Sequence, residues 1–359
     1  LLENIDDPNA NEFSTKYQSD LYLQNINVSG YAVITKNTNI KQNLNVDQDI
    51  NIKDNLNVNS ITTLLDNAYT HNVTNTGHII NTDYANFHKN VAISNNLDVF
   101  QNVNIRDSLN VYTNINAMQN LNITDTLNIK QNVNAHSNVN IYEDLNIYKD
   151  TYVMNTLTVD NNINTKQNLN ITDTLNIDQN INAYSNLNTH SNFNVYKNAY
   201  VMDTLTVDAN INTKQNLNIT DTLSIDQNVN AYSNVNIHED LNIYKDTYVM
   251  NTLTVDNNIN TKQNLNITDT LNIDQNINAY SNLNTHGHFN VYKNAYVMET
   301  LTVDANINTK QNLNITDTLN IDQNVNAYSN LNTYGHFNVY KNAYVMETLT
   351  VNANINTKQ

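Results

Sequence analysis

Residues 169–216 read LNITDT LNIDQN INAYSN LNTHSN FNVYKN AYVMDT LTVDAN INTKQN. This stretch is a run of eight six-residue words. In each hexad the first residue is apolar, the third is Ile, Val, Ala or Thr, and the second is mostly Asn. Apolar residues two apart are typical of a short strand with one buried face and do not fit a helix. Each hexad therefore predicts about three or four strand residues followed by a two-residue corner.

The hexads continue without a slip from Val73 to Ile355, which makes 48 consecutive copies, and position one is apolar in 46 of them. The two exceptions are Thr151 and Thr247. A longer 48-residue repeat is superimposed, because the string NTKQ recurs with that period. The Lys residues of this string are Lys166, Lys214, Lys262, Lys310 and Lys358. Self-similarity of this kind is typical of solenoid architectures.

The N-terminal part departs from this pattern. Residues 1–25 show no hexads, and a first short array at 26–60 runs one residue out of register with the later one. We expect the register to slip in a loop or bulge at 61–72, before the continuous array of 73–359. We also expect residues 1–25 to form a cap or docking arm, in which the candidate contact residues are Asp6, Asp7, Pro8 and Phe13. Because the pattern is interrupted at Gln359, we expect the natural chain to continue.

A strand this short cannot bury its face alone and must stack on copies of itself. The sequence therefore predicts an all-β fold, a β-solenoid or β-helix built from hexapeptide repeats. A three-sided left-handed coil, with three hexads to the turn, is favoured. A two-sided coil with two hexads to the turn and a homotrimeric β-prism remain alternatives, because the 48-residue repeat divides evenly into two-hexad turns and not into three-hexad turns.

Asn is expected to have two roles in this fold, one at the corners and one on the strands. The chain has only 4 Gly, so Asn at position six is expected to turn the corners in the left-handed backbone region that Gly usually supplies. Asn at position two is expected to form outward amide ladders between stacked copies.

Composition narrows the function classes. The chain has no Cys, which excludes disulfides and thiolate chemistry. Its 34 acidic and 17 basic residues give a net charge of −17, so we expect no nucleic-acid partner. No apolar run reaches eighteen residues, and we expect no membrane insertion.

No stretch carries a known catalytic, cofactor or phosphate-binding motif, so we expect no catalytic residue, no cofactor and no metal. His286 and His288 lie two residues apart without an evident third ligand. Outward tyrosines at position two recur with the 48-residue period and are the candidate lateral-contact strip. They are Tyr152, Tyr200, Tyr248, Tyr296 and Tyr344.

Runs such as LNVDQDINIKDNLNVNS and NLDVFQNVNIRDSLNVYTN resemble the hexapeptide arrays of phage and large-virus fibre proteins and of bacterial surface fibres. The resemblance covers nearly all of residues 26–359, although this chain uses Asn where those arrays often use Gly. It implies a rigid shaft on the outside of a cell or on a virion.

These observations together predict a structural fibre or filament protein that is not an enzyme. Its expected partner is itself, end to end or side by side, including as a trimer. The alternative is a repeat adhesin that binds carbohydrate or another surface through outward Tyr and Asn ladders.

Overall fold

The computed structural model contains strands and no helix among the residues that it describes. These residues are 13–15, 21–23, 26–28, 32–34, 37–46, 50–52, 56–59, 62–64, 68–70, 73–75, 77, 79–81, 85–87 and 89–358. The chain divides into two compact units, residues 1–178 and 179–359, and each is described by itself.

Every strand among the described residues is three residues long. The first thirteen are β1 (Phe13–Thr15), β2 (Leu21–Leu23), β3 (Ile26–Val28), β4 (Ala32–Ile34), β5 (Thr38–Ile40), β6 (Leu44–Val46), β7 (Ile50–Ile52), β8 (Leu56–Val58), β9 (Thr62–Leu64), β10 (Ala68–Thr70), β11 (Val73–Asn75), β12 (Ile79–Asn81) and β13 (Ala85–Phe87). From β14 (Val91–Ile93) to β58 (Ile355–Thr357) a strand begins every six residues. The hexad therefore is one strand and one corner, as its alternation predicts.

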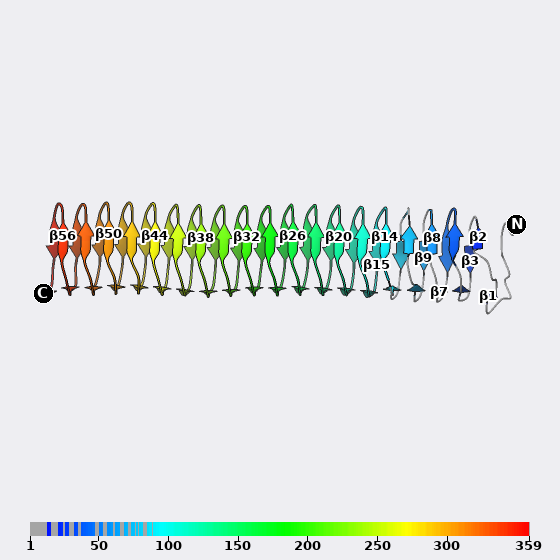
Figure 1. The fold of residues 1–359 in the computed structure, drawn as a ribbon, viewed down its shortest axis with the longest axis horizontal. Coiled ribbons are helices and arrows are strands. Elements are labelled where there is room, and N and C mark those ends of the chain that lie inside the picture. Colours follow the sequence, from blue (N-terminus) through cyan, green and yellow to red (C-terminus); the bar gives the residue numbers. More distant parts are fainter. Residues whose placement is uncertain are drawn as a thin grey trace. The chain divides into compact units, whose positions relative to one another are not determined.

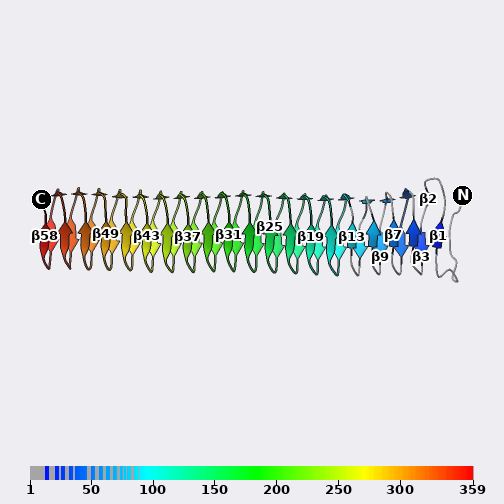
Figure 2. The same cartoon turned by 60° about the horizontal axis from the view of Figure 1, so that its bottom comes forward.

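Within each unit, strands that pair in a sheet run parallel and are three places apart along the chain. In the second unit, β47 (Phe289–Val291) lies between β44 (Leu271–Ile273) and β50 (Ile307–Thr309), with the same 18-residue step on both sides. Three successive strands thus complete one coil, one strand to a face. Figure 1 shows β38, β44, β50 and β56 along one face of this unit, and Figure 2 shows β37, β43 and β49 along another.

The fold is therefore a three-sided β-solenoid, and the same 18-residue pairing occurs in the first unit, where β17 (Leu109–Val111) pairs with β20 (Leu127–Ile129). The 18-residue step within one chain rules out the two alternatives, the two-sided coil and the trimeric β-prism. A two-sided coil would pair each strand with the second one along, and a trimeric prism would take each coil from three chains. The left-handed winding stays a prediction.

The core is made by positions one and three. From β14 to β55 (Phe337–Val339) these residues are buried in every strand, while position two is half-buried or exposed. Large and small residues compensate within a coil, since Phe289 on one face is followed by Ala295 on the next and both are fully enclosed. This filling matches the dense packing that protein interiors need.

Backbone groups at the corners are also paired between coils. The N–H of position one donates to the carbonyl of position six in the next coil, as Leu283 does to Thr300 at 3.0 Å. The N–H of position four donates to the carbonyl of position three in the preceding coil, as Tyr280 does to Thr261 at 2.9 Å. Each coil is therefore hydrogen-bonded to its neighbour both along the strands and at the corners.

The corners do not use left-handed backbone. No described residue, glycine included, has positive φ, so the predicted role of Asn at position six is wrong. The side chain acts instead as an acceptor: Oδ1 of Asn276 receives the backbone N–H of Asn294 at 3.1 Å. Asp240 does the same for the N–H of Asn258 at 3.0 Å. The amide is selected because it closes a backbone hydrogen bond that the strand ladder leaves open.

The N-terminal part of the first unit joins the same stack. Strands β9 and β10 lie within 61–72, the stretch expected to form a loop, and they pair with β12 and β13 at a 17-residue step. The register slip is therefore a coil that is one residue shorter. Phe13 lies in β1, which pairs with β4, whereas Asp6, Asp7 and Pro8 lie outside the described residues.

Candidate functional site

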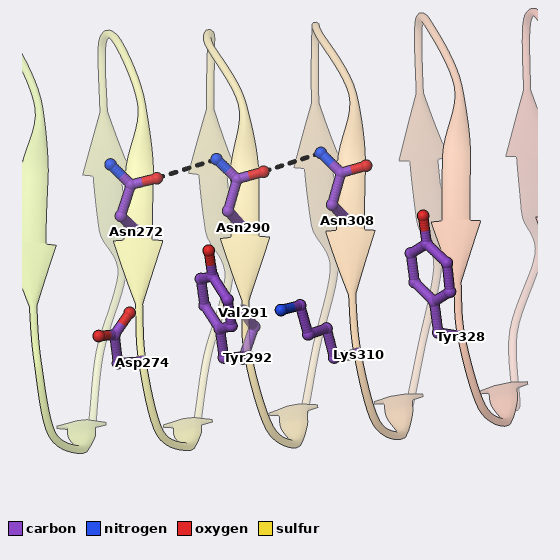
Figure 3. A pocket seen from close by; sticks show the side chains of 8 residues that line it. All are labelled: Asn272, Asp274, Asn290, Val291, Tyr292, Asn308, Lys310 and Tyr328. Atoms are coloured by element: carbon purple, nitrogen blue, oxygen red, sulfur yellow. Dashed lines mark hydrogen bonds between the residues drawn. The ribbon is translucent and has the colours of Figure 1, made fainter.

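Position two forms the predicted amide ladders. Nδ2 of Asn290 donates to Oδ1 of Asn272 at 2.9 Å, and Nδ2 of Asn308 donates to Oδ1 of Asn290 at 2.8 Å. Figure 3 shows these three side chains in line across consecutive coils. Each amide is thus both donor and acceptor along the stack, which holds neighbouring coils in register.

Position four, the first corner residue after each strand, carries the chemical variety of the surface. Because the 48-residue repeat lies on an 18-residue coil, each copy of the repeat begins on a different face. The residues that stack along one edge therefore come from different hexads. On the edge that includes Tyr292 the order is His238, Asp256, Asp274, Tyr292, Lys310, Tyr328 and Met346.

Lysine stacks on tyrosine along these edges. The ammonium of Lys310 lies 4.0 Å from the ring centroid of Tyr292, one coil back. Every Lys of the NTKQ string does the same, and so does Lys130. The pairs are Lys130–Tyr112, Lys166–Tyr148, Lys214–Tyr196, Lys262–Tyr244, Lys310–Tyr292 and Lys358–Tyr340, at 4.0 to 5.4 Å. Contacts of this length are cation–π interactions.

Histidine and aspartate also pair along these edges, one coil apart. Nδ1 of His190, His238 and His286 lies 2.6, 2.8 and 2.5 Å from an Asp carboxylate one coil further on. These imidazoles are exposed, and surface pairs of this kind contribute little stability. In the described part of the chain no three His, Asp or Glu side chains gather as metal ligands.

The two neighbouring histidines have different partners. His286 faces Asp304, whereas Nδ1 of His288 lies 3.4 Å from the backbone N–H of Asn306 and occupies the place of a position-six Asn. The pair therefore does not converge on one point.

A surface hollow of about 710 Å³ lies over the ends of β44, β47, β50 and β53 (Val325–Ala327). Its wall is the amide ladder, and its position-four residues are Asp274, Tyr292, Lys310 and Tyr328. Figure 3 shows the Lys310 side chain directed toward Tyr292 and away from Tyr328. We call the last three residues the Tyr–Lys–Tyr groove.

The outward tyrosines at position two lie on different faces. In the second unit Tyr200 and Tyr344 belong to one sheet, Tyr248 to another and Tyr296 to the third. Tyr152 lies in β24 (Thr151–Val153) of the first unit. A 48-residue spacing on an 18-residue coil moves each copy to the next face, so these residues do not form one strip in the second unit.

One of these tyrosines nevertheless adjoins the groove. The ring of Tyr344 meets that of Tyr328 edge to face, with centroids 6.5 Å apart and planes at 68°. Such pairs hold aromatic rings in a defined orientation.

Two carboxyl groups of the first unit have shifted pKa values. The pKa of Asp125 is lowered, chiefly because the Ser108 hydroxyl donates to it at 2.9 Å. The pKa of Asp160 is raised, first by burial and second by the charge of Asp178 in the next coil. Both shifts are consequences of contacts between stacked coils.

Comparison of the chain with protein-family models, with curated proteins and with solved structures found no match. In the described residues no helix has the length and apolar character needed to cross a membrane.

Proposed function

We propose that this protein is a structural one, a stiff β-solenoid shaft that serves as a fibre or filament on the outside of a cell or on a virion and associates with itself. The observation that carries the proposal is the uniform stacking within each unit. From β14 onward the coils of each unit repeat the same 18-residue step, with backbone and amide ladders continuing from one coil to the next. A chain built this way resists bending because every coil is bonded at three faces and three corners.

The proposal needs no catalysis. The charged and aromatic groups at position four recur in the same order along the edges and are used in pairs between coils. A catalytic centre requires a distinct constellation that converges on one substrate atom. We therefore propose a non-enzymatic role, without cofactor or nucleic-acid partner.

Electron microscopy with mass-per-length measurement tests the shaft. The chain has a mass of 40.9 kDa over 359 residues, and each 18-residue coil advances the stack by about 4.8 Å. A single-chain shaft should therefore measure about 0.43 kDa per Å, given that coil rise. A threefold higher value would indicate side-by-side trimers. Compact particles without a fibre would contradict the proposal.

A second candidate role is that of an adhesin. It is favoured by the Tyr–Lys–Tyr groove, whose exposed aromatic rings lie beside a wall of amides. Tyrosine and asparagine are effective recognition residues because they combine contact area with hydrogen bonding. A glycan array without signal would remove this role and leave the shaft unaffected.

A further inference from the structure

The residue order of the Tyr–Lys–Tyr groove occurs three times in the second unit, once on each edge. The copies are Tyr196–Lys214–Tyr232, Tyr244–Lys262–Tyr280 and Tyr292–Lys310–Tyr328. In all three the Lys ammonium lies over the first ring, at 4.4, 4.1 and 4.0 Å from its centroid. The arrangement is thus a repeated feature of the surface.

These lysines are not neutralised by the protein's own carboxylates. Although acidic residues are twice as frequent as basic ones, the ion pairs of the described residues join His to Asp. Lys310 instead lies on the face of Tyr292. An ammonium has three N–H donors, so Lys310 retains donors for an acidic group entering the groove from the side of Tyr328.

The second tyrosine offers an apolar platform. The side chain of Tyr328 is 48% exposed, and its ring is held by the edge contact with Tyr344. On the wall of the hollow, Asn290 and Asn308 each use one of their two amide N–H groups in the ladder. A ligand in the groove therefore meets a flat ring, a positive charge and a row of amide donors and acceptors.

We propose that each Tyr–Lys–Tyr groove binds a saccharide that carries a carboxylate, such as a hexuronate. The sugar ring stacks on the second tyrosine, its carboxylate accepts hydrogen bonds from the lysine, and its hydroxyls bond to the asparagine amides. A nucleic acid is disfavoured because its dense phosphates meet a chain of charge −17. This inference rests on the adhesin role and does not require the shaft.

The repeat fixes the number and placement of these sites. Neighbouring grooves in the second unit are one 48-residue repeat apart, which is two and two-thirds coils, or about 13 Å along the stack. Each lies on a different edge. One groove spans three coils, so it accommodates a short oligosaccharide, and the unit offers three separate sites to ligands approaching from different sides.

Isothermal titration of the full chain with trigalacturonate tests the proposal, and the methyl ester of the same trisaccharide is the matched ligand. The ester keeps the rings and hydroxyls but loses the charge. We expect the acid to bind and the ester to bind at least about tenfold more weakly, the size of effect expected when a charged hydrogen bond is lost. Equal affinities, or no binding of the acid, would overturn the proposal.

Two sets of five substitutions separate the site from general charge. The first changes the stacked lysines to Gln, at Lys130, Lys166, Lys214, Lys262 and Lys310. The second changes the neighbouring position-five lysines to Gln, at Lys149, Lys197, Lys245, Lys293 and Lys341. Both remove the same charge, and circular dichroism checks that both variants remain folded.

We expect the first set to weaken binding of the acid at least about tenfold and the second set to change it little. Equal loss in both sets would overturn the proposal, because it would assign binding to overall charge. As a further check, changing Tyr232, Tyr280 and Tyr328 to Ala should weaken binding, and changing them to Phe should preserve it. A glycan-array signal that none of these variants alters would keep the adhesin role and remove these sites.

Discussion

The same three residues, Leu-Thr-Val, occur in an interior coil of the second unit and in its last coil. In β49 (Leu301–Val303) both apolar side chains are fully buried, whereas in β57 (Leu349–Val351) Leu349 is 40% exposed. Both strands pair with the strand of the preceding coil, and β49 also pairs with β52 (Leu319–Ile321) of the following coil. Burial is therefore a property of the stack, and a single hexad has no core of its own.

The Lys–Tyr contacts at the surface also differ between an interior coil and the last coil. Lys310 in the interior lies 4.0 Å from its tyrosine ring, while Lys358 in the last coil lies 5.4 Å from its own. The same Lys–Tyr contact is thus closer in this interior coil than in the last coil of the unit.

The largest expected difference between these two settings is in the core. Leu301→Ala should destabilise the second unit by about 2–5 kcal/mol, because it leaves a cavity that stacked coils cannot close. Leu349→Ala should cost less than about 1 kcal/mol, as substitutions at exposed sites do.

Native-state hydrogen exchange of the amides around each site is the suitable measurement, since stacked repeats open locally rather than all at once. Equal losses at Leu301 and Leu349 would show that the hexad is stable without its neighbours, against the comparison above.

A smaller effect is expected at position six. Asn276→Ala removes the acceptor for the backbone N–H of Asn294 and should cost about 1–2 kcal/mol. Asn276→Asp keeps an acceptor oxygen, as Asp240 does naturally, and should cost much less. Exchange of the Asn294 amide in the two Asn276 variants tests this order.

The hexad predicts its own strand well, and the three-sided coil that the sequence favours over two alternatives is confirmed by the 18-residue step. Alternation in residues such as Leu301, Thr302 and Val303 places one side chain outward and two inward, and the structure confirms this. The number of sides depends on the bend at the corner, which is determined by contacts between coils. The 48-residue repeat, which divides evenly into two-hexad turns, pointed away from the observed 18-residue step.

The stacked pairs at position four were not predicted from the sequence, because the 18-residue coil was still one of three alternatives there. Lys310 and Tyr292 occupy the same place in consecutive coils, as do His286 and Asp304, so the pairs are visible in the sequence once the step is known. The groove follows from them. The role of Asn at position six was predicted from backbone preference alone, and its actual role as acceptor depends on the N–H of the coil above.

A gain in stability of about 1 kcal/mol is expected from Thr309→Val, because the Thr309 hydroxyl is buried without a hydrogen-bond partner. Thr261 occupies the same place in an identical hexad, but its hydroxyl donates to the carbonyl of Gln263 at 2.9 Å. Thr261→Val should therefore give no such gain. Thermal unfolding of the two variants and the parent chain makes the comparison, and stabilisation of both would contradict the assigned difference.

The smallest expected effect concerns the pKa of Asp160. The hexad of this residue, LTVDNN, recurs with Asp256 at the same position, but the residues one coil away are different. Asp256 faces His238 at 2.8 Å, whereas Asp160 follows Tyr142 and precedes Asp178. Burial and Asp178 raise the pKa of Asp160 above its ordinary 3.8. A carboxyl with a raised pKa binds its proton more tightly in the folded chain, so it adds stability as the pH falls through the raised value and subtracts it above.

Asp178→Asn removes the second of these causes and should bring the pKa of Asp160 part of the way back toward 3.8, which a carbon-13 NMR titration of the carboxyl measures. Tyr142→His should lower it as well, by giving Asp160 the neighbour that Asp256 has. If neither variant shifts the pKa of Asp160, the position-four residues one coil away do not control this carboxyl. If both do, a side chain one coil away determines its charge state, in the same way that a coil above determines the burial of Leu301.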